Sequence, residues 1–285
     1  MSKIAIVTDS TAYIPNELSR DYPIHVIPLQ VIWDQQVFAD GIDIQPDEFY
    51  ARLKNSKTMP TTSQPTPAAF EKTYKQLIDQ DYEILSMHIS AKLSGTIDSA
   101  MQAREHVDKK RVEIVDSFST SMGLGFPVMA VARAAADGAT LQDCKALAEK
   151  ARDHTGLFFL LNTLEFLHRG GRIGGAAAFV GTALNLKPIL HIHEGAIVAA
   201  GKVRTWKNAV DRLIELVMQK IGNERPIHLA GLYSDTPDES KLVLDRVRSY
   251  YGSTDVIEST VTIVSPVLGV HVGPGAVGLI YMSGI

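Results

Sequence analysis

The first half of the chain alternates short apolar runs with stretches of helical periodicity. Apolar runs of strand length occur at Ile4–Val7, Tyr82–Ile89 and Val112–Val115. Segments with the spacing of amphipathic helices follow them, for example Ala68–Gln80. Strands that alternate with helices are typical of a mostly parallel sheet covered by helices on both faces. We therefore predict an α/β fold for this half.

The pattern changes at Gly156, which precedes the strongly apolar run Leu157–Leu161. Five further strands and three helices are predicted beyond it. The predicted segments are Ala176–Leu186 (helix), Lys187–Val198 (strand, turn, strand), Lys207–Ile221 (helix), Ile227–Tyr233 (strand), Pro237–Tyr250 (helix), Val256–Ile263 (strand) and Ala276–Met282 (strand). With 285 residues, close to twice a typical domain, we predict two α/β domains, 1–155 and 156–285, each with a mostly parallel or mixed sheet.

The one long uncharged stretch is Val261–Ile285. It contains Pro266, Pro274 and several glycines, which disfavour a membrane helix. We interpret it as two buried strands joined by a Gly-Pro-Gly turn. The N-terminal apolar run is interrupted at Asp9, too early for a signal peptide. We therefore expect a cytoplasmic protein.

Composition narrows the function classes. The net charge is −4 and no basic stripe is present, which argues against nucleic acid as a partner. A single cysteine, Cys144, excludes an internal disulfide and any metal site built from several cysteines. Cys144 lies within a helical pattern, where a packing role is more common than a catalytic one.

The stretch from Ser90 to Ala100 carries the first chemical signal. It joins a buried strand to a helix, so Leu93–Thr96 is predicted at a strand-to-helix turn. Such turns present backbone N–H groups and hydroxyls to anions at the edge of an α/β sheet. Ser94 is a natural N-cap, and Gly95 allows close approach to the backbone. A simple capped helix, without a ligand, explains the same residues.

A second hydroxyl-rich segment is Met59–Pro67, in which three prolines forbid a helix and favour an extended loop. Thr61, Thr62, Ser63 and Thr66 place four hydroxyls in this short loop. A solvated loop with Thr66 capping the next helix is the alternative interpretation.

Enzymatic and metal-binding alternatives are weaker. The glycines of 170–175 fit neither a Walker loop nor a dinucleotide-binding fingerprint. His191 and His193 alternate on a predicted strand and share one face, and Glu194 follows at a turn, so a metal site is conceivable. The spacing does not place a third ligand beside the two histidines. A hydrolase or phosphotransferase that uses Ser94 and His271, with Asp9 or Asp116 as the third member, stays open, although the sequence around Ser94 lacks the GxSxG elbow.

Seven short motifs in this order resemble the DegV family, bacterial fatty-acid-binding proteins that serve as the B subunit of fatty acid kinase. The motifs are Thr8–Thr11, Thr62–Pro65, Leu93–Thr96, Asp116–Ser117, Arg169–Ile173, Lys187–Ile189 and Gly269–Gly275. Each is short, but together they extend over almost the whole chain.

The resemblance implies an N-terminal domain of the dihydroxyacetone-kinase/DegV type and a fatty acid buried between and within the domains. It implies a carrier without catalysis or cofactor of its own. A separate kinase subunit would use ATP to phosphorylate the bound carboxylate, and the acyl phosphate would supply phospholipid synthesis.

We assign the ligand-binding residues within these motifs. A carboxylate that leaves water must keep hydrogen-bond donors. Hydroxyls of Thr62 and Ser94, N–H groups at the start of the following helix, and His271 suit that need. The predicted ligand-binding set is Asp9, Thr62, Ser63, Ser94, Gly95 and His271.

Two further predictions concern the second domain. The small residues of Ile173–Leu186, among them Gly174–Ala178 and Gly181, are expected to leave a tunnel open for the acyl tail, although close helix packing explains them equally well. Two basic clusters are expected to form a docking face for the kinase, unless local carboxylates such as Glu165 or Asp211 pair with them. They comprise Arg169, Arg172, Lys202 and Arg204.

Overall fold

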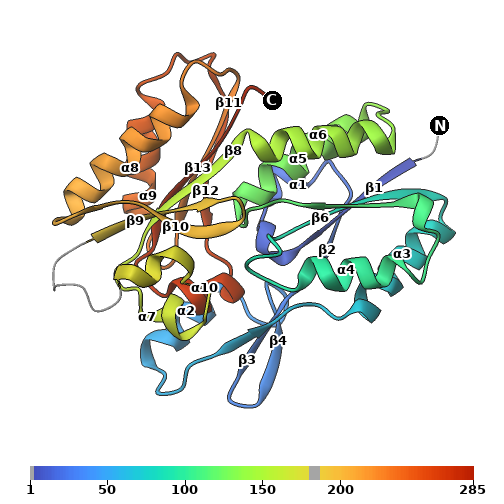
Figure 1. Cartoon of the computed structure of the whole chain (residues 1–285), viewed down its shortest axis with the longest axis horizontal. Coiled ribbons are helices and arrows are strands. Elements are labelled where there is room, and N and C mark those ends of the chain that lie inside the picture. The colour runs from blue at the N-terminus through green and yellow to red at the C-terminus, as the bar shows by residue number, and fades with distance from the viewer. Residues whose placement is uncertain (1–2, 180–186) are drawn as a thin grey trace.

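The computed structural model describes residues 3–179 and 187–285 (Figure 1). Its first half is built on a four-stranded parallel sheet in the order β2-β1-β6-β7. The strands are β1 (Lys3–Asp9), β2 (Ile24–Ile27), β6 (Tyr82–His88) and β7 (Val112–Asp116). Parallel strands end at a common edge, so the polar turns after β1, β6 and β7 lie close together.

Helices cover both faces of this sheet, as the alternation of the sequence predicts. On one face α3 (Pro67–Asp79) and α4 (Thr96–Arg104) pack on Val7 and Ile84. On the other, α5 (Met122–Ala136) and α6 (Leu141–Asp153) pack on Ile6 and Leu85. Successive residues of a strand point to opposite faces, so the continuous apolar runs serve both layers. Cys144 is buried in the second layer, as predicted.

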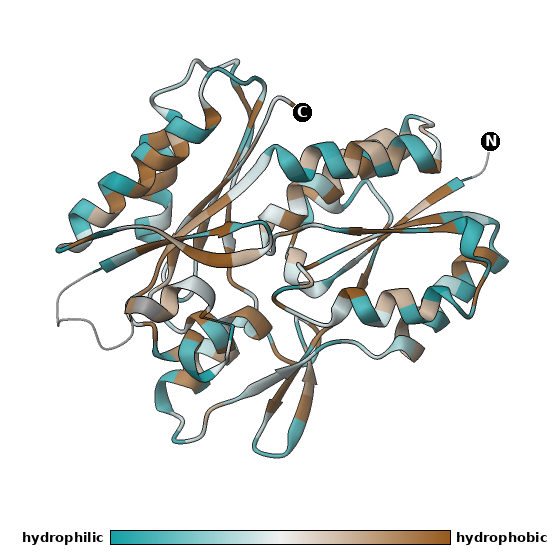
Figure 2. Ribbon diagram, in the orientation of Figure 1, coloured by the Kyte–Doolittle hydropathy of each residue, from teal (hydrophilic) through white to brown (hydrophobic). Residues whose placement is uncertain are grey.

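The second half contains a six-stranded mixed sheet in the order β10-β9-β8-β13-β11-β12, in which only the β11–β12 pair is parallel. The strands are β8 (Thr155–Leu160), β9 (Lys187–His193), β10 (Ala196–Val203), β11 (Ile227–Tyr233), β12 (Val256–Ile263) and β13 (Val277–Ser283). Helices α8 (Trp206–Ile221) and α9 (Asp238–Arg248) cover its outer face. The hydrophobic residues line the strands, whereas the outer helix surfaces are hydrophilic (Figure 2).

The inner face of the six-stranded sheet packs against the first half of the chain. The largest apolar cluster joins Leu157, Phe159 and Ile280 of this sheet to Met122 at the start of α5 and to Trp33. Trp33 belongs to a small antiparallel sheet, β4-β3-β5, made of β3 (Gln30–Trp33), β4 (Gln36–Ala39) and β5 (Thr61–Ser63). Pro28 lies in the break between β2 and β3.

The C-terminal stretch differs from its prediction. Between β12 and β13 the chain forms helix α10 (Pro266–Val272) instead of continuing as strand and turn. Pro266 occupies the first helical turn, and Gly273, with φ of 70°, ends the helix. The β-branched residues of this short segment resemble a strand in sequence. Its helical form depends on packing: a Cβ on Gly269 would lie 2.6 Å from Phe49 of α2 (Pro46–Asn55).

The small-residue segment also differs in part. A 3₁₀-helix, η3, covers Gly174–Phe179, where we predicted the start of an α-helix. It lies against β10, since a Cβ on Gly174 would meet the carbonyl oxygen of Ile197 at 2.4 Å. The remainder of the predicted helix, including Gly181, lies outside the described residues. None of the described helices is long and apolar enough to span a lipid bilayer.

Candidate functional site

A cavity lies between the carboxyl edge of the parallel sheet and the inner face of the six-stranded sheet. It encloses about 780 Å³ of space, its opening included. Polar side chains line one part of it and apolar ones the rest. The lining residues are Thr11, Leu29, Thr62, Ser63, Gln64, Ile89, Leu93, Ser94, Thr120, Ser121, Leu157, Phe159, Leu167, Arg172, Ile192, Ile197, Leu232, Val264, Val267, Leu268, His271 and Val272.

Thr62 and His271, 209 residues apart, meet at the polar part of this cavity. The Oγ1 atom of Thr62 lies 2.9 Å from Nε2 of His271. Thr62 is held in β5 by its pairing with Val31 of β3, and His271 lies in the last turn of α10. Two of the residues predicted to bind a ligand are thus brought together by the fold.

His271 is neutral at physiological pH. Burial, together with the nearby charge of Arg172, lowers the pKa of His271 to about 4. Its Nδ1 atom is buried, and no residue described by the structure makes a hydrogen bond to it. A Cβ on Gly170 would lie 2.1 Å from Nδ1, so the glycine allows the ring to occupy this place. The imidazole can therefore serve as a hydrogen-bond partner but does not supply a positive charge.

Ser94 also lines the cavity, but it is not the helix cap that the sequence suggests. Helix α4 begins one residue later than expected, at Thr96, and Gly95 takes the N-cap position without a side-chain hydrogen bond. The Oγ atom of Ser94 instead lies 2.9 Å from Oγ1 of Thr96. Ser94 therefore keeps its hydroxyl at the cavity wall.

Gly95 stands just behind the lining. A Cβ at this position would lie 2.9 Å from the side-chain amide of Gln64, which itself lines the cavity beside Ser63. The glycine thus allows the Thr62–Pro65 loop and the Ser94 turn to approach each other closely. Of the predicted ligand-binding residues, Thr62, Ser63, Ser94 and His271 line the cavity, and Gly95 supports it.

Arg172, predicted as a docking residue, also lines the cavity, and its side chain is exposed. Its Nε donates to the carbonyl oxygen of Leu93 at 3.2 Å, and its Nη1 donates to that of Gly170 at 2.8 Å. These bonds tie the glycine-rich turn to the Ser94 turn. Among the lining residues that the structure describes, Arg172 alone carries a permanent charge.

Asp9 does not line this cavity but is fully buried beside it. Its Oδ1 accepts hydrogen bonds from the N–H and the hydroxyl of Thr11, and its Oδ2 accepts from the N–H of Ile89. The Nδ1 atom of His88 lies 3.1 Å from Oδ2. The carboxylate thus fixes the position of Thr11 and Ile89, both of which line the cavity.

His88 continues this network into the core. Its Nε2 lies 2.6 Å from Oγ of Ser86, which lies 2.7 Å from the hydroxyl of Tyr74. An Asp–His–Ser chain therefore exists, formed by Asp9, His88 and Ser86, but all three side chains are fully buried and none lines the cavity. Sequence reasoning missed it. The signal was the pair of polar residues, Ser86 and His88, inside an otherwise apolar strand.

The arrangement expected of a hydrolase is not found among the described residues. Ser94 is bonded to Thr96, and His271 is bonded to Thr62. Asp116 accepts from the N–H groups of Ala91 and Phe118, and burial raises its pKa. A serine nucleophile needs a base within hydrogen-bond reach, and the described contacts of Ser94 include none.

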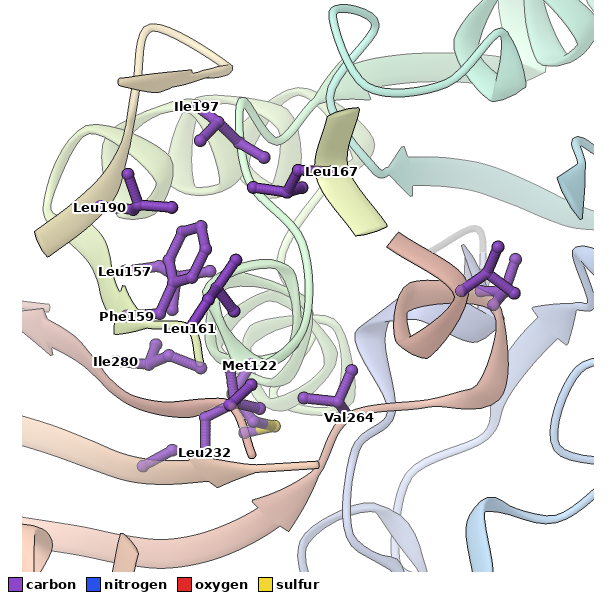
Figure 3. Packing of buried hydrophobic residues seen from close by; sticks show 14 of the residues in the cluster. Met122, Leu157, Phe159, Leu161, Leu167, Leu190, Ile197, Leu232, Val264 and Ile280 are labelled. Atoms are coloured by element: carbon purple, nitrogen blue, oxygen red, sulfur yellow. The ribbon is translucent and has the colours of Figure 1, made fainter. Parts of the chain in front are cut away.

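The apolar wall comes from elements that the tail prediction did not include. Leu157 and Phe159 of β8 lie beside Ile197 of β10 and Leu167 of α7 (Glu165–Arg169) (Figure 3). By contrast, Gly174, Gly175 and Ala177 are exposed, and none of Ile173–Ala177 lines the cavity. The pattern of the sequence identified a segment beside β10 but not the strand residues that form the wall.

The other three residues of the predicted docking face, Arg169, Lys202 and Arg204, lie on the surface. Arg169 pairs with Glu165 at 2.6 Å, and both side chains are about half exposed, at 56% each. This is the local pairing that the sequence left open. Lys202 and Arg204 of the β10 end are exposed, and no ion pair to either of them is found in residues 3–179 and 187–285. In the same ranges no three histidine, cysteine or acidic side chains are grouped to hold a metal ion.

Comparisons with known sequences agree on the protein family. The family model described as "Uncharacterised protein, DegV family" matches residues 3–284. A DegV domain-containing protein of Streptomyces coelicolor is 36% identical over 282 residues, 98% of each chain. Protein DegV of Bacillus subtilis is 33% identical over 277 residues, 97% of this chain and 98% of the other.

Solved structures are similar over almost their whole length. A fatty-acid-binding DegV family protein from Thermus thermophilus superposes with a TM-score of 0.90 at 35% identity, covering 99% of each chain. DegV of Bacillus subtilis, described as a fatty acid binding protein, superposes with a TM-score of 0.89 at 31% identity, covering 99% of this chain and 100% of the other. The match of the family model over 3–284 and these whole-chain similarities show that the chain belongs to the DegV family.

Proposed function

We propose that the protein binds a long-chain fatty acid in this cavity and presents its carboxylate to a separate, ATP-dependent kinase. The observation that carries the proposal is a cavity that has a polar part, formed by Thr62, Ser94, Arg172 and His271, and an apolar part from both halves of the chain. Its division matches an amphipathic ligand with one polar end. The related proteins described as fatty-acid-binding support the same ligand class.

The polar part suits a carboxylate that must stay reactive. Hydroxyl groups of Thr62 and Ser94 donate hydrogen bonds, and Arg172 near them supplies the compensating positive charge. His271 is neutral, so it orients the Thr62 hydroxyl instead of pairing ionically. Hydroxyl contacts leave a carboxylate oxygen with lone pairs that can attack the γ-phosphorus of ATP.

The apolar part suits the acyl tail. About 15 buried methylenes contribute roughly 12 kcal/mol before ordering costs, at about 0.8 kcal/mol each. Much of this is offset by the loss of ligand freedom. The tail supplies most of the affinity, and the polar groups fix which end stays at the kinase-accessible part of the cavity.

The kinase transfers the γ-phosphoryl group of ATP to the carboxylate oxygen, giving acyl phosphate and ADP. No residue of this chain needs to act as nucleophile or base, because the carboxylate is already ionised at neutral pH. The protein would act as a carrier, and the acyl phosphate would be used in phospholipid synthesis. Lys202 and Arg204, with Arg169, are the candidates for docking the kinase.

Native mass spectrometry of the purified protein tests the ligand. We expect a co-purified mass that corresponds to a fatty acid. In a binding assay with the delipidated protein, Ser94→Ala and Thr62→Val should each weaken binding about tenfold, since a hydrogen bond to a charged group contributes roughly 1.5–3 kcal/mol. Thr73→Val, on the outer face of α3, is the matched control.

Unchanged affinity in both Ser94→Ala and Thr62→Val, with the fold intact by circular dichroism, would contradict the carboxylate assignment. An empty protein with esterase turnover would instead favour the hydrolase alternative.

A further inference from the structure

Three hydroxyl-bearing residues line the cavity in addition to those assigned to the carboxylate. Thr11 lies in η1 (Ser10–Ala12), and Thr120 and Ser121 lie at the start of α5. The two elements are in contact, because a Cβ on Gly125 would lie 3.2 Å from the carbonyl oxygen of Ala12. The hydroxyls therefore belong to one wall of the cavity, contributed by the carboxyl edge of the parallel sheet.

This wall adjoins the apolar part of the cavity. Met122, which follows Ser121, belongs to the same cluster as Leu157 and Phe159 and lies beside Leu232 and Val264 in Figure 3. A Cβ on Gly123 would lie 3.8 Å from Cβ of Leu157. The start of α5 thus packs closely against β8, whose side chains form the apolar wall.

The hydroxyls of Thr120 and Ser121 are buried and have no hydrogen-bond partner among the residues that the structure describes; the two residues are only 8% and 1% exposed. Buried hydroxyls are normally paired, and an unpaired one costs about 1–3 kcal/mol. Thr11 differs, since its hydroxyl donates to Asp9 at 2.6 Å and only its lone pairs remain. The wall offers two free donors and one acceptor.

The fold retains this arrangement against a conformational cost. Ser121 has φ of 52° and ψ of −147°, a region that is almost restricted to glycine. A glycine would adopt it freely, but would remove the hydroxyl. The side chain does not cap α5, so capping does not explain the serine.

We propose that Thr120 and Ser121 form a second polar subsite, which binds an oxygen substituent, such as a hydroxyl group, on the chain of the fatty acid. This inference rests on the proposed function. A neutral oxygen fits better than a second carboxylate, because the only permanent charge among the described lining residues, Arg172, is already assigned to the acid group. The preferred ligand class is therefore hydroxy fatty acids.

Competition binding to the delipidated protein tests the subsite, with a fluorescent fatty acid as probe. Hexadecanoic and octadecanoic acids are compared with a series of their monohydroxy derivatives that differ in the position of the hydroxyl group. We expect at least one positional isomer to bind about tenfold more tightly than its parent acid, as one to two hydrogen bonds provide.

Variants then locate the contact. Thr120→Val and Ser121→Ala should abolish the preference, so that the parent acid and its hydroxy derivative bind with equal affinity. Alanine is used at 121 because glycine would also change the backbone freedom. Thr62→Val should weaken both acids by the same factor and keep their ratio, and Thr73→Val should change neither.

The outcomes separate the two proposals. If the wild-type protein binds no fatty acid, the proposed function fails. If it binds the parent acids but prefers no hydroxy isomer, only the subsite is overturned. A preference that persists in the folded Thr120→Val/Ser121→Ala double variant also overturns it.

Discussion

At the scale of single residues, the buried pair of Asp9 and His88 fixes one edge of the cavity. Both carboxylate oxygens of Asp9 have hydrogen-bond partners: Oδ1 contacts Thr11, and Oδ2 contacts Ile89 and His88. A buried carboxylate is tolerated only when its partners are complete. The position of Thr11 therefore depends on a buried residue that does not line the cavity itself.

Replacement of His88 by leucine should strongly destabilise the fold. The substitution leaves Asp9 without one partner in a fully buried position, and breaking a buried pair costs about 3–5 kcal/mol. Denaturant unfolding measures this free energy. His106→Leu removes an exposed contact of a histidine with Glu71 and serves as the control, with an expected effect of about 0.5 kcal/mol or less. Equal effects of the two variants would contradict the role of the network.

The pH dependence of stability should carry the signature of His271. Its folded-state pKa of about 4 lies below the ordinary value of 6.5. Between these values the unfolded chain binds a proton that the folded chain does not, so stability falls as the pH decreases from about 6.5 to about 4.

Asp40 acts in the opposite direction, because burial raises its pKa to about 6 and the folded chain then binds the extra proton. The two contributions are separated by comparing unfolding free energies of the wild type and His271→Gln across this range. The variant should lose less stability on acidification. Parallel curves would show that His271 titrates normally in the folded protein.

At the scale of elements, the glycine-rich turn and α10 position the polar part of the cavity together. Gly170 lies against the imidazole of His271, and Gly171 next to it has open space around its Cα but a φ of 67°. Gly170→Ala would place a methyl group 2.1 Å from Nδ1 and displace the ring.

We expect Gly170→Ala to weaken fatty-acid binding at least tenfold, because the Thr62–His271 contact is lost and the donor hydroxyl is no longer oriented. Gly171→Ala is the matched control: it costs about 1 kcal/mol of stability through its positive φ, without a steric clash at the site. Equal losses of binding in the two variants would indicate that fatty-acid binding depends on the flexibility of the turn and not on the position of the imidazole.

The elements differ in how far the sequence predicts them. The strands and helices of the parallel half follow from apolar runs and from capping residues such as Thr140 and Asp143, which form a capping box. Helix α10 does not, because its seven residues are stabilised by packing against α2 and not by intrinsic propensity. Ser121 and Leu157 escaped notice at the site because nothing local distinguishes a wall residue from a core residue.

At the scale of the whole molecule, the cavity exists only because the two halves are joined. Val267 N–H donates to Asp40 at 3.0 Å, Tyr50 donates to the carbonyl oxygen of Val264 at 3.1 Å, and Ser90 donates to that of Gly195 at 2.8 Å. The paired residues are 227, 214 and 105 positions apart in the sequence, respectively. No sequence pattern specifies contacts over such separations. The short motifs predicted which turns carry the polar residues of the site. The apolar wall is formed by the packing of the sheets, which the motifs do not describe.

The proposed docking of a kinase would also depend on the assembled surface of the molecule. Arg169, Lys202 and Arg204 are exposed, and the pair of Arg169 with Glu165 is half solvated, so a partner's carboxylates can compete for it at little cost. Electrostatic docking mainly raises the association rate and makes it depend on salt. Substitution of these residues should leave fatty-acid binding unchanged, because none of the three side chains lines the cavity.

We therefore expect Lys202→Glu/Arg204→Glu, and separately Arg169→Ala, to retain fatty acid but to lose acyl-phosphate production at limiting concentrations of the kinase. The rate should fall less steeply with added salt than it does for the wild type, since fewer charges contribute to the encounter. Lys207→Glu, an exposed charge reversal on α8, controls for net charge. Turnover equal to that of the wild type in these variants, with the ligand bound normally, would leave Arg169 as a helix ion pair and Lys202 and Arg204 as solvated surface residues, and would place the docking face elsewhere on the molecule.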